Sequence, residues 1–347
     1  MSSTEEALQC GSVSREDTHF GLRVASIFII FVGSSLGAIF PILASRLRTL
    51  NVHKSIFEGA KYFGSGVIIA TAFIHLLAPA IEQLGSPCLK GTWTEYPWVP
   101  AIAMISVFMV FFVELAAFRW GTAKLDALGV KGYDNHGHAH DSAGRHGAHG
   151  PETASPTTPS NPEKALTQSD SELGHAHQHV LTDSALAQIL GVAILESGVV
   201  FHSILTGMTL AVDDDFIALF VVLIFHQTFE GLGLGTRLAS LSLPDAYRTW
   251  APYAGALVYG ITTPVGIAAG LGIRSSYNPG STASSIIGGM FDSISAGILL
   301  YTGLVELLAH EFIFNPTMHR APMGKLLYAC GMMCFGAALM ALLGRWA

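Results

Sequence analysis

The sequence predicts an all-α membrane protein that crosses the bilayer eight times and contains an inverted repeat of helices. The first observation is composition: apolar residues make up 50% of the 347 residues, charged residues only 12%, and the mean hydropathy is +0.47. A soluble domain of this length carries roughly twice that charged fraction. The second observation is a set of long apolar runs, and the third is a pattern that occurs in two of them. Together these observations place the chain in a bilayer.

The apolar runs have the length of membrane-spanning helices, which need about 20 residues each. None of the runs alternates between apolar and polar residues, as the strands of a membrane β-barrel do. We expect helices at 22–44, 58–82, 97–119, 185–211, 215–239, 251–273, 284–310 and 324–345. The expected parts are an extracellular N-terminal tail at 1–21, three helices within 22–119, a disordered histidine-rich cytosolic loop at 120–184, and five helices within 185–347.

The distribution of lysine and arginine predicts the orientation of the chain. With eight spans, alternate loops share one side of the membrane, and the loops of one side with their flanks hold 13 of these residues against 5 on the other. Without the long loop at 120–184 the ratio is still 8 to 5. Because positive residues stay in the cytoplasm, both termini are expected outside the cell. Cys10 and Cys88 would then lie outside too, where a disulfide between them could form.

Two of the expected helices carry a matching pattern. Residues 66–78 read GVIIATAFIHLLA and residues 297–309 read GILLYTGLVELLA, so that His75 aligns with Glu306. The two helices cross the membrane in opposite directions, because an odd number of spans separates them. We infer an inverted repeat of the first three and the last three helices around a central pair, as in secondary transporters. A chance likeness between two helices rich in leucine, isoleucine and glycine is the alternative.

The central pair of helices carries one histidine each at membrane depth. His202 stands in FHSILTG and His226 in FHQTFEG, and both lie about equally far from the acidic turn at 213–215. They should therefore reach the same depth, near the middle of the membrane. Glu230 follows His226 by four residues and shares its helix face.

Two imidazoles and a carboxylate suit a divalent cation such as Zn²⁺, and they would accept Fe²⁺, Mn²⁺ or Cd²⁺. Ser203 and Gln227 could add weaker oxygen ligands. Hydrogen bonding between helices is the alternative role, but an ionised glutamate at this depth costs at least about 2.5 kcal/mol. Pro264, in the next expected helix, should break that helix beside the site.

Further polar residues in the spans are candidates for an ion pathway. Glu196 lies almost two turns before His202, on the cytoplasmic side. His75, Glu306 and His310 lie on the two helices of the repeat. Bonding between helices would explain these three equally well.

The motifs HSILTG and HQTFEG, with GVIIATAFIHLLAPA (66–80) and SAGILLYTGLVELLAHEF (295–312), resemble those of the ZIP family of metal transporters, its fungal and plant plasma-membrane branch above all. The resemblance extends over all eight spans. It implies import into the cytoplasm, outward termini and a transport site at His202, His226 and Glu230. Some prokaryotic members have acidic residues where this chain has Thr206, Gln227 and Thr263, and bind a second metal there. We therefore expect one principal ion.

The long loop contains eight of the fifteen histidines, around a segment rich in proline, serine and threonine. Its composition is typical of a disordered linker. We interpret these histidines as a cytosolic acceptor, buffer or sensor for arriving metal, with a simple spacer as the alternative. They are His136, His138, His140, His146, His149, His175, His177 and His179.

The expected function is zinc uptake across the plasma membrane, with zinc as cargo and no cofactor. No G-x-x-x-x-G-K-[ST] motif is present, so ATP hydrolysis by this chain is not expected. No basic patch indicates nucleic-acid binding; the expected partners are metal ions, the lipid bilayer and a second copy in a homodimer. The alternatives are a broad importer of iron, manganese, cadmium and zinc, a membrane metalloenzyme, and a metal-sensing receptor. The enzyme would need a base such as that of H-E-x-x-H, which is absent.

Overall fold

The fold was analysed in a computed structural model, which describes residues 19–47, 52–127, 169–213, 215–274 and 281–346. All regular structure in these ranges is helical, and eight stretches are long and apolar enough to cross a membrane. The helices are α1 (Phe20–Arg46), α2 (Lys54–Ala70), η2 (Thr71–Leu77), α3 (Ala78–Leu84), α4 (Thr92–Glu95), α5 (Trp98–Ala127), α6 (Ser169–Val212), α7 (Phe216–Ser240), α8 (Asp245–Arg248), α9 (Ala251–Ile273), α10 (Thr282–Tyr301), η3 (Thr302–Ile313), α11 (Pro316–His319) and α12 (Met323–Leu343). The predicted fold class and its eight spans are confirmed.

The chain divides into two compact units. The first comprises residues 1–114 and 188–347, and the second comprises residues 115–187. The second unit holds the end of α5 and the beginning of α6. All contacts discussed below lie within the first unit.

The beginning of α6 differs from the prediction. We expected a loop without regular structure up to residue 184, whereas α6 starts at Ser169. The Pro-rich segment ends at Pro162, and the residues from 169 onward include alanine, leucine, glutamate and glutamine, which favour helix. The apolar run at 185–211 therefore indicated only the membrane-spanning part of the longer helix α6.

Two π-helical segments lie at matching positions of the repeat. η2 begins at Thr71 and η3 begins at Thr302, and these threonines are aligned in the repeated pattern. His75 lies on η2 and Glu306 lies on η3. A π-helix is rare and often marks a functional position. Its occurrence at the same register in both halves agrees with the inverted repeat.

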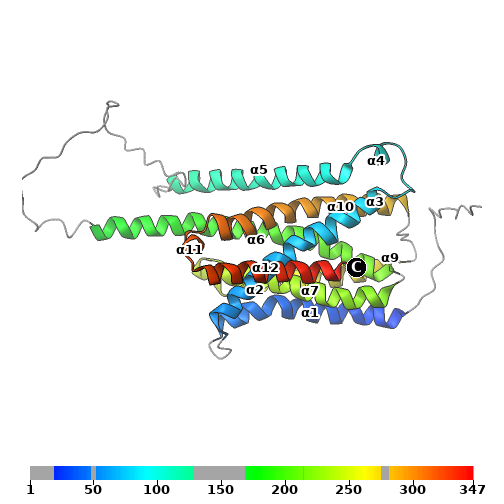
Figure 1. Ribbon diagram of the computed structural model, residues 1–347, viewed down its shortest axis with the longest axis horizontal. Helices are drawn as coiled ribbons and strands as arrows, with labels where there is room; N and C mark the ends of the chain where they lie inside the picture. Colours follow the sequence, from blue (N-terminus) through cyan, green and yellow to red (C-terminus); the bar gives the residue numbers. More distant parts are fainter. Residues whose placement is uncertain (1–18, 48–51, 128–168, 214, 275–280, 347) are drawn as a thin grey trace, which may run out of the picture. The chain divides into compact units, whose positions relative to one another are not determined.

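Helix packing in the first unit forms two groups. The first contains α1, α7 and α9, and the second contains α2, η2, α3, α10, η3 and α12; α2 and α7 also pack against each other across the boundary. α1 packs along α7 and α9, whereas α2 packs along α12, and α10 packs against η2 and α3 (Figure 1). Glycines allow the close approach of α7 to α1: a Cβ on Gly235 would lie only 2.2 Å from the carbonyl oxygen of Ala38. Small residues let membrane helices approach closely, which adds dispersion contacts along their length.

A buried arginine joins α1 to the hairpin of α6 and α7. The guanidinium of Arg23 donates hydrogen bonds to the carbonyl oxygens of Leu210 and Ala211, each at 3.1 Å, and to that of Asp213 at 2.7 Å. It also lies over the ring of Phe216, 4.5 Å from the centroid. The carbonyls of Leu210 and Ala211 belong to the last turn of α6, where carbonyls lack partners within the helix, and that of Asp213 directly follows it. Arg23 therefore fixes the turn that sets the register of α6 against α7.

The predicted break of the sixth span at Pro264 is wrong, because α9 continues through this residue. A proline inside a helix leaves the carbonyl of the residue four positions earlier without its usual donor. That residue is Gly260, and its oxygen accepts a hydrogen bond from the Ser34 hydroxyl at 3.3 Å. The neighbouring helix α1 thus supplies the missing donor, as happens for prolines in membrane helices.

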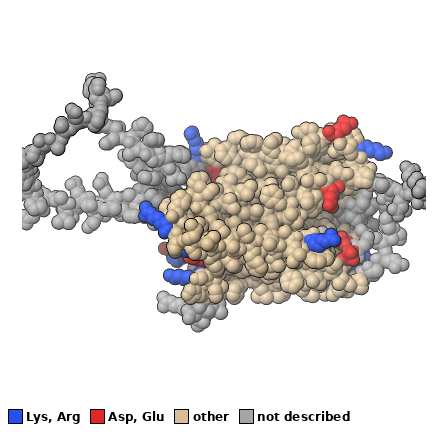
Figure 2. All heavy atoms as spheres, viewed as in Figure 1, with Lys and Arg blue, Asp and Glu red and all other residues tan. Residues whose placement is uncertain are grey.

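Charged residues lie at the two ends of the visible face, and a belt without lysine, arginine, aspartate or glutamate lies between them (Figure 2). Large apolar side chains such as Phe28, Phe108 and Phe335 are more than half exposed. In water such a surface would be costly, but in a bilayer it faces hydrocarbon.

Replacing Gly235 with alanine should destabilise the protein by about 1–3 kcal/mol, because the new methyl group would overlap the backbone of α1. Thermal unfolding in detergent measures the effect. Gly331→Ala is the matched control, since a Cβ at Gly331 meets no atom within 4 Å. Equal melting temperatures for the two variants would contradict this packing.

Candidate metal centre

The three residues predicted as metal ligands come together in the interior. His202 on α6 and His226 and Glu230 on α7 are 3%, 1% and 1% exposed, respectively. One ligand atom from each lies within 4.8 Å of the others, which makes this a group able to hold a metal ion. The depth argument from the sequence therefore agrees with the positions of these side chains.

The distances between the ligand atoms suit a tetrahedral ion. The Nε2 atoms of His202 and His226 are 3.2 Å apart, and Nε2 of His226 lies 3.4 Å from Oε1 of Glu230. Two nitrogen ligands at about 2.0–2.1 Å from a tetrahedral zinc ion lie roughly 3.3 Å from each other. An ion could bind between these atoms with little movement of the side chains.

Glu230 is the most informative member of the group. Both of its carboxylate oxygens are buried and form no hydrogen bond of good geometry with the described residues, although Nε2 of His226 lies 3.4 Å from Oε1. Burying a carboxylate without a donor is costly, so natural proteins pair such groups or use them to coordinate metals. A divalent cation would supply the missing partner.

Two neighbouring residues orient side chains at the site: Thr206 contacts His202, and Tyr259 contacts Gln227, the residue after His226. The Thr206 hydroxyl lies 3.3 Å from Nδ1 of His202 and donates to the carbonyl of the same residue at 2.9 Å. The Tyr259 hydroxyl lies 2.6 Å from the backbone oxygen of Gln227 and 2.8 Å from its Oε1. Partners outside the ligand set orient ligands in this way at metal sites. We had not predicted either role. The i,i+4 spacing of Thr206 from His202 is a signal that would have found the first.

The two weaker ligand candidates are buried beside the histidines. Ser203 and Gln227 are both 0% exposed. The Ser203 hydroxyl and Nε2 of Gln227 have no hydrogen-bond partner, whereas Oε1 of Gln227 is occupied by Tyr259. The role of these two residues as ligands stays a prediction.

His75 lies directly against the group but outside it. Its ring packs edge-on against that of His226, with 4.7 Å between the centroids. Its Nε2 lies 3.0 Å from the backbone oxygen of Met340, so this nitrogen carries the hydrogen. Its Nδ1 is then the acceptor, as a ligand on a pathway would need.

The other pathway candidates lie apart from the three ligands. Glu196 faces Gly255 of α9, and its Oε1 is buried without a partner. Glu306 lies against Gly191 of α6, and its Oε2 is 3.1 Å from Nδ1 of His310. Glu196, Glu306 and His310 do not belong to the metal-binding group. Their place on an ion path stays a prediction.

The histidine tracts cannot be placed beside this site. His136, His138, His140, His146 and His149 lie outside the described residues. His175, His177 and His179 belong to α6, but the structure does not describe their side chains.

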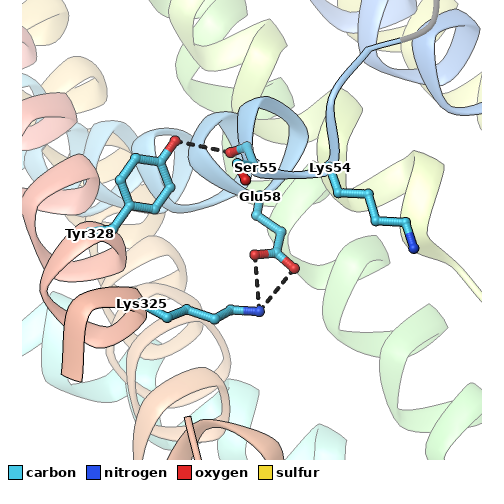
Figure 3. Close-up of a pocket in the computed structure, with 5 residues that line it drawn as sticks. All are labelled: Lys54, Ser55, Glu58, Lys325 and Tyr328. Atoms are coloured by element: carbon cyan, nitrogen blue, oxygen red, sulfur yellow. Dashed lines mark hydrogen bonds and ion pairs between the residues drawn. The ribbon is translucent and has the colours of Figure 1, made fainter. Parts of the chain in front are cut away.

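A separate hollow of about 480 Å³ lies where α2 and α12 begin (Figure 3). Lys325 forms an ion pair with Glu58, and the Tyr328 hydroxyl donates to the carbonyl of Ser55 at 2.9 Å. Lys54 completes the lining. No residue of this hollow belongs to the metal-binding group, and its bonds join the two helices of one packing group.

A bundle of eight membrane-spanning helices with a buried His/Glu group between two of them defines a class: polytopic proteins that move metal ions across membranes. The family model described as "ZIP Zinc transporter" matches residues 20–344. The chain therefore belongs to the ZIP family and transports zinc across a membrane; it is a transporter and not an enzyme.

Similar proteins are known in fungi and plants. The chain is 37% identical to "Zinc-regulated transporter 2" of Saccharomyces cerevisiae, with 97% of each chain covered. It is 39% identical to "Zinc-regulated transporter 1" of the same yeast, over 95% of this chain and 88% of the relative. For "Zinc transporter 9" of Oryza sativa subsp. japonica the identity is 34%, over 94% of this chain and 89% of the relative.

Removing one ligand should weaken zinc binding by more than about 100-fold, since loss of an outer partner alone costs 10–100-fold. The parent for this test is protein in which the eight loop histidines are alanine. This parent and its His202→Ala and Glu230→Gln variants would each be purified and titrated with zinc in a calorimeter. His53→Asn is the control, because His53 is exposed and asparagine can also cap α2. Unchanged affinity in both site variants would exclude this group as the binding site.

Proposed function

We propose that this protein imports zinc through the plasma membrane into the cytoplasm, and that the ion passes the three ligands on α6 and α7. The observation that carries the proposal is the buried carboxylate of Glu230, which forms no hydrogen bond of good geometry with the described residues and lies beside two imidazoles. Residues of this kind inside a membrane typically mark an ion pathway. No ATP hydrolysis by this chain is involved.

Two observations support outward termini. Lysine and arginine are concentrated in the loops that would face the cytoplasm. Cys88, in the loop between the second and third spans, is disulfide-bonded. Disulfides persist in oxidising surroundings such as the cell exterior. Both observations support the same side of the membrane as the exterior.

The proposed transport cycle needs no more than a change in exposure of one site. Zinc exchanges its water for the imidazoles and the carboxylate, and α6 and α7 then move with α1 and α9 against the other helices. The packing of α1 with α7 and α9 supports this division, and the contact between α7 and α2 is the one that would have to change during the movement. The membrane potential favours entry by about 2.3 kcal/mol per charge per 100 mV. Protons compete with zinc for the imidazoles, so uptake should weaken as the external pH falls.

The ligand types also support transport of other ions. Two imidazoles and one carboxylate accept Fe²⁺, Mn²⁺ and Cd²⁺ as well as Zn²⁺. With one carboxylate in the group, we propose a single principal ion. The histidines of the long loop would receive zinc after release and are not needed for the membrane step.

Purified protein in liposomes should accumulate ⁶⁵Zn down its gradient without ATP, and Glu230→Ala should abolish this flux because the charged ligand is lost. Glu82→Ala is the control, since Glu82 is an exposed carboxylate near the end of the same membrane span as His75. Competition with unlabelled iron, manganese and cadmium then ranks the metals. Full flux in Glu230→Ala, with a working control, would refute the proposed path.

Replacing the eight loop histidines with alanine should lower the number of zinc ions bound per protein but leave the initial rate of uptake into liposomes unchanged. The physical reason is that the proposed ligands inside the membrane, His202, His226 and Glu230, include none of these eight histidines. Equilibrium dialysis measures the first quantity and radioactive uptake the second. A large fall in the rate would mean that the loop takes part in the membrane step.

A further inference from the structure

Arg237 is a buried cation on the helix that carries two of the metal ligands. It follows Glu230 by seven residues and His226 by eleven, so all three share one face of α7. It lies roughly 10 Å beyond Glu230 along the helix axis, toward the proposed cytosolic end. Its side chain is 9% exposed.

The guanidinium of Arg237 bonds to two helices of the other packing group. Its Nη1 donates to Oε1 of Glu311 on η3 at 2.6 Å, and its Nη2 donates to the Ser65 hydroxyl on α2 at 2.5 Å. Nζ of Lys61, also on α2, lies 2.5 Å from the same carboxylate oxygen. Three elements, α2, α7 and η3, are therefore tied at one point.

The packing between the metal ligands and this ion-pair cluster is tight. Gly64 on α2 and Gly233 on α7 bring the two backbones together, so that a Cβ on Gly64 would lie 2.2 Å from the Cα atom of Gly233. Buried apolar residues from α2, α6 and α7, among them Ile68, Leu195 and Leu234, form one cluster on the same side. A hydrated cation cannot pass such a contact without separation of the helices.

Many of the other polar contacts join helices within one group. Tyr259 joins α9 to α7, and Lys325 joins α12 to α2. Arg23 joins α1 to the end of α6, the hairpin partner of α7. Arg237, by contrast, joins α7 of the first group to α2 and η3 of the second. Its position is where two groups that move relative to each other would separate.

We propose that Arg237 is a positioning residue that keeps the cytosolic exit closed while zinc enters from outside. Through Glu311 and Ser65 it holds α7 against α2 and η3, and release of zinc requires these bonds to break. The inference rests on the proposed function, because it assigns the cytosolic side and the path. It adds a residue that touches no metal and controls access to the site.

The test measures access to the metal site from the cytosolic side. Ser203→Cys supplies a small thiol next to His202, in protein in which the free cysteines Cys330 and Cys334 are serine. Inside-out vesicles are treated with a charged methanethiosulfonate that does not cross the membrane. The labelling rate is compared between this parent and the added substitutions Arg237→Gln, Ser65→Ala and Arg237→Lys. Lys325→Gln is the control, because its ion pair lies within one group.

Arg237→Gln should raise the labelling rate about tenfold or more, because removing one partner of a buried ion pair strongly favours the open arrangement. Ser65→Ala should raise the labelling rate less. Arg237→Lys keeps the charge and should label at a rate close to that of the parent, which would not be expected if substitution at this position simply unfolded the protein. The control should label like the parent. Equal rates for parent and Arg237→Gln would overturn the inference.

Addition of zinc separates this inference from the proposed function. If zinc slows labelling in every variant, each variant is folded and binds zinc at the proposed site. Differences between the labelling rates then test the role of Arg237 alone. If zinc slows labelling in none of them, the proposed site itself fails, and the inference fails with it.

Discussion

The structure depends on one electrostatic constraint, the burial of Glu230 beside two histidines inside a protein surrounded by hydrocarbon. A carboxylate in this position is expensive unless a cation compensates it. Among the described residues neither of its oxygens forms a hydrogen bond of good geometry, although most buried polar groups in proteins form one. The site is therefore electrostatically incomplete without an ion, and this property lets a transporter bind zinc in place of the ion's water.

The rest of the fold serves to set the register of α6 against α7. Arg23 ties α1 to the last turn of α6, and Gly235 lets α7 approach α1 closely. Thr206 and Tyr259 then fix side chains at the site itself. These contacts join α1, α6, α7 and α9, so the positions of the proposed ligands depend on these helices. We propose that this group moves against α2, α10 and α12 with the ligand distances kept, while the contact between α2 and α7 changes.

Sequence alone predicted the eight spans, and it pointed to three residues that lie together in the structure, because hydropathy and the i,i+4 spacing of His226 and Glu230 are local signals. Their role as ligands stays a prediction. It did not predict the continuity of α9, since the donor that satisfies Gly260 is Ser34, a residue far away in the chain. The partners of Arg237 were missed for the same reason. The start of α6 was missed because hydropathy marks the membrane boundary and not the end of a helix.

The most direct test of the central claim is X-ray absorption at the zinc edge of purified, zinc-loaded protein in which the loop histidines are alanine. Two imidazoles and one carboxylate predict nitrogen and oxygen neighbours at about 2.0–2.2 Å, with the scattering pattern of two imidazole rings. His202→Ala should remove one ring from that pattern. A spectrum with sulfur neighbours, or one without imidazole rings, would contradict the account.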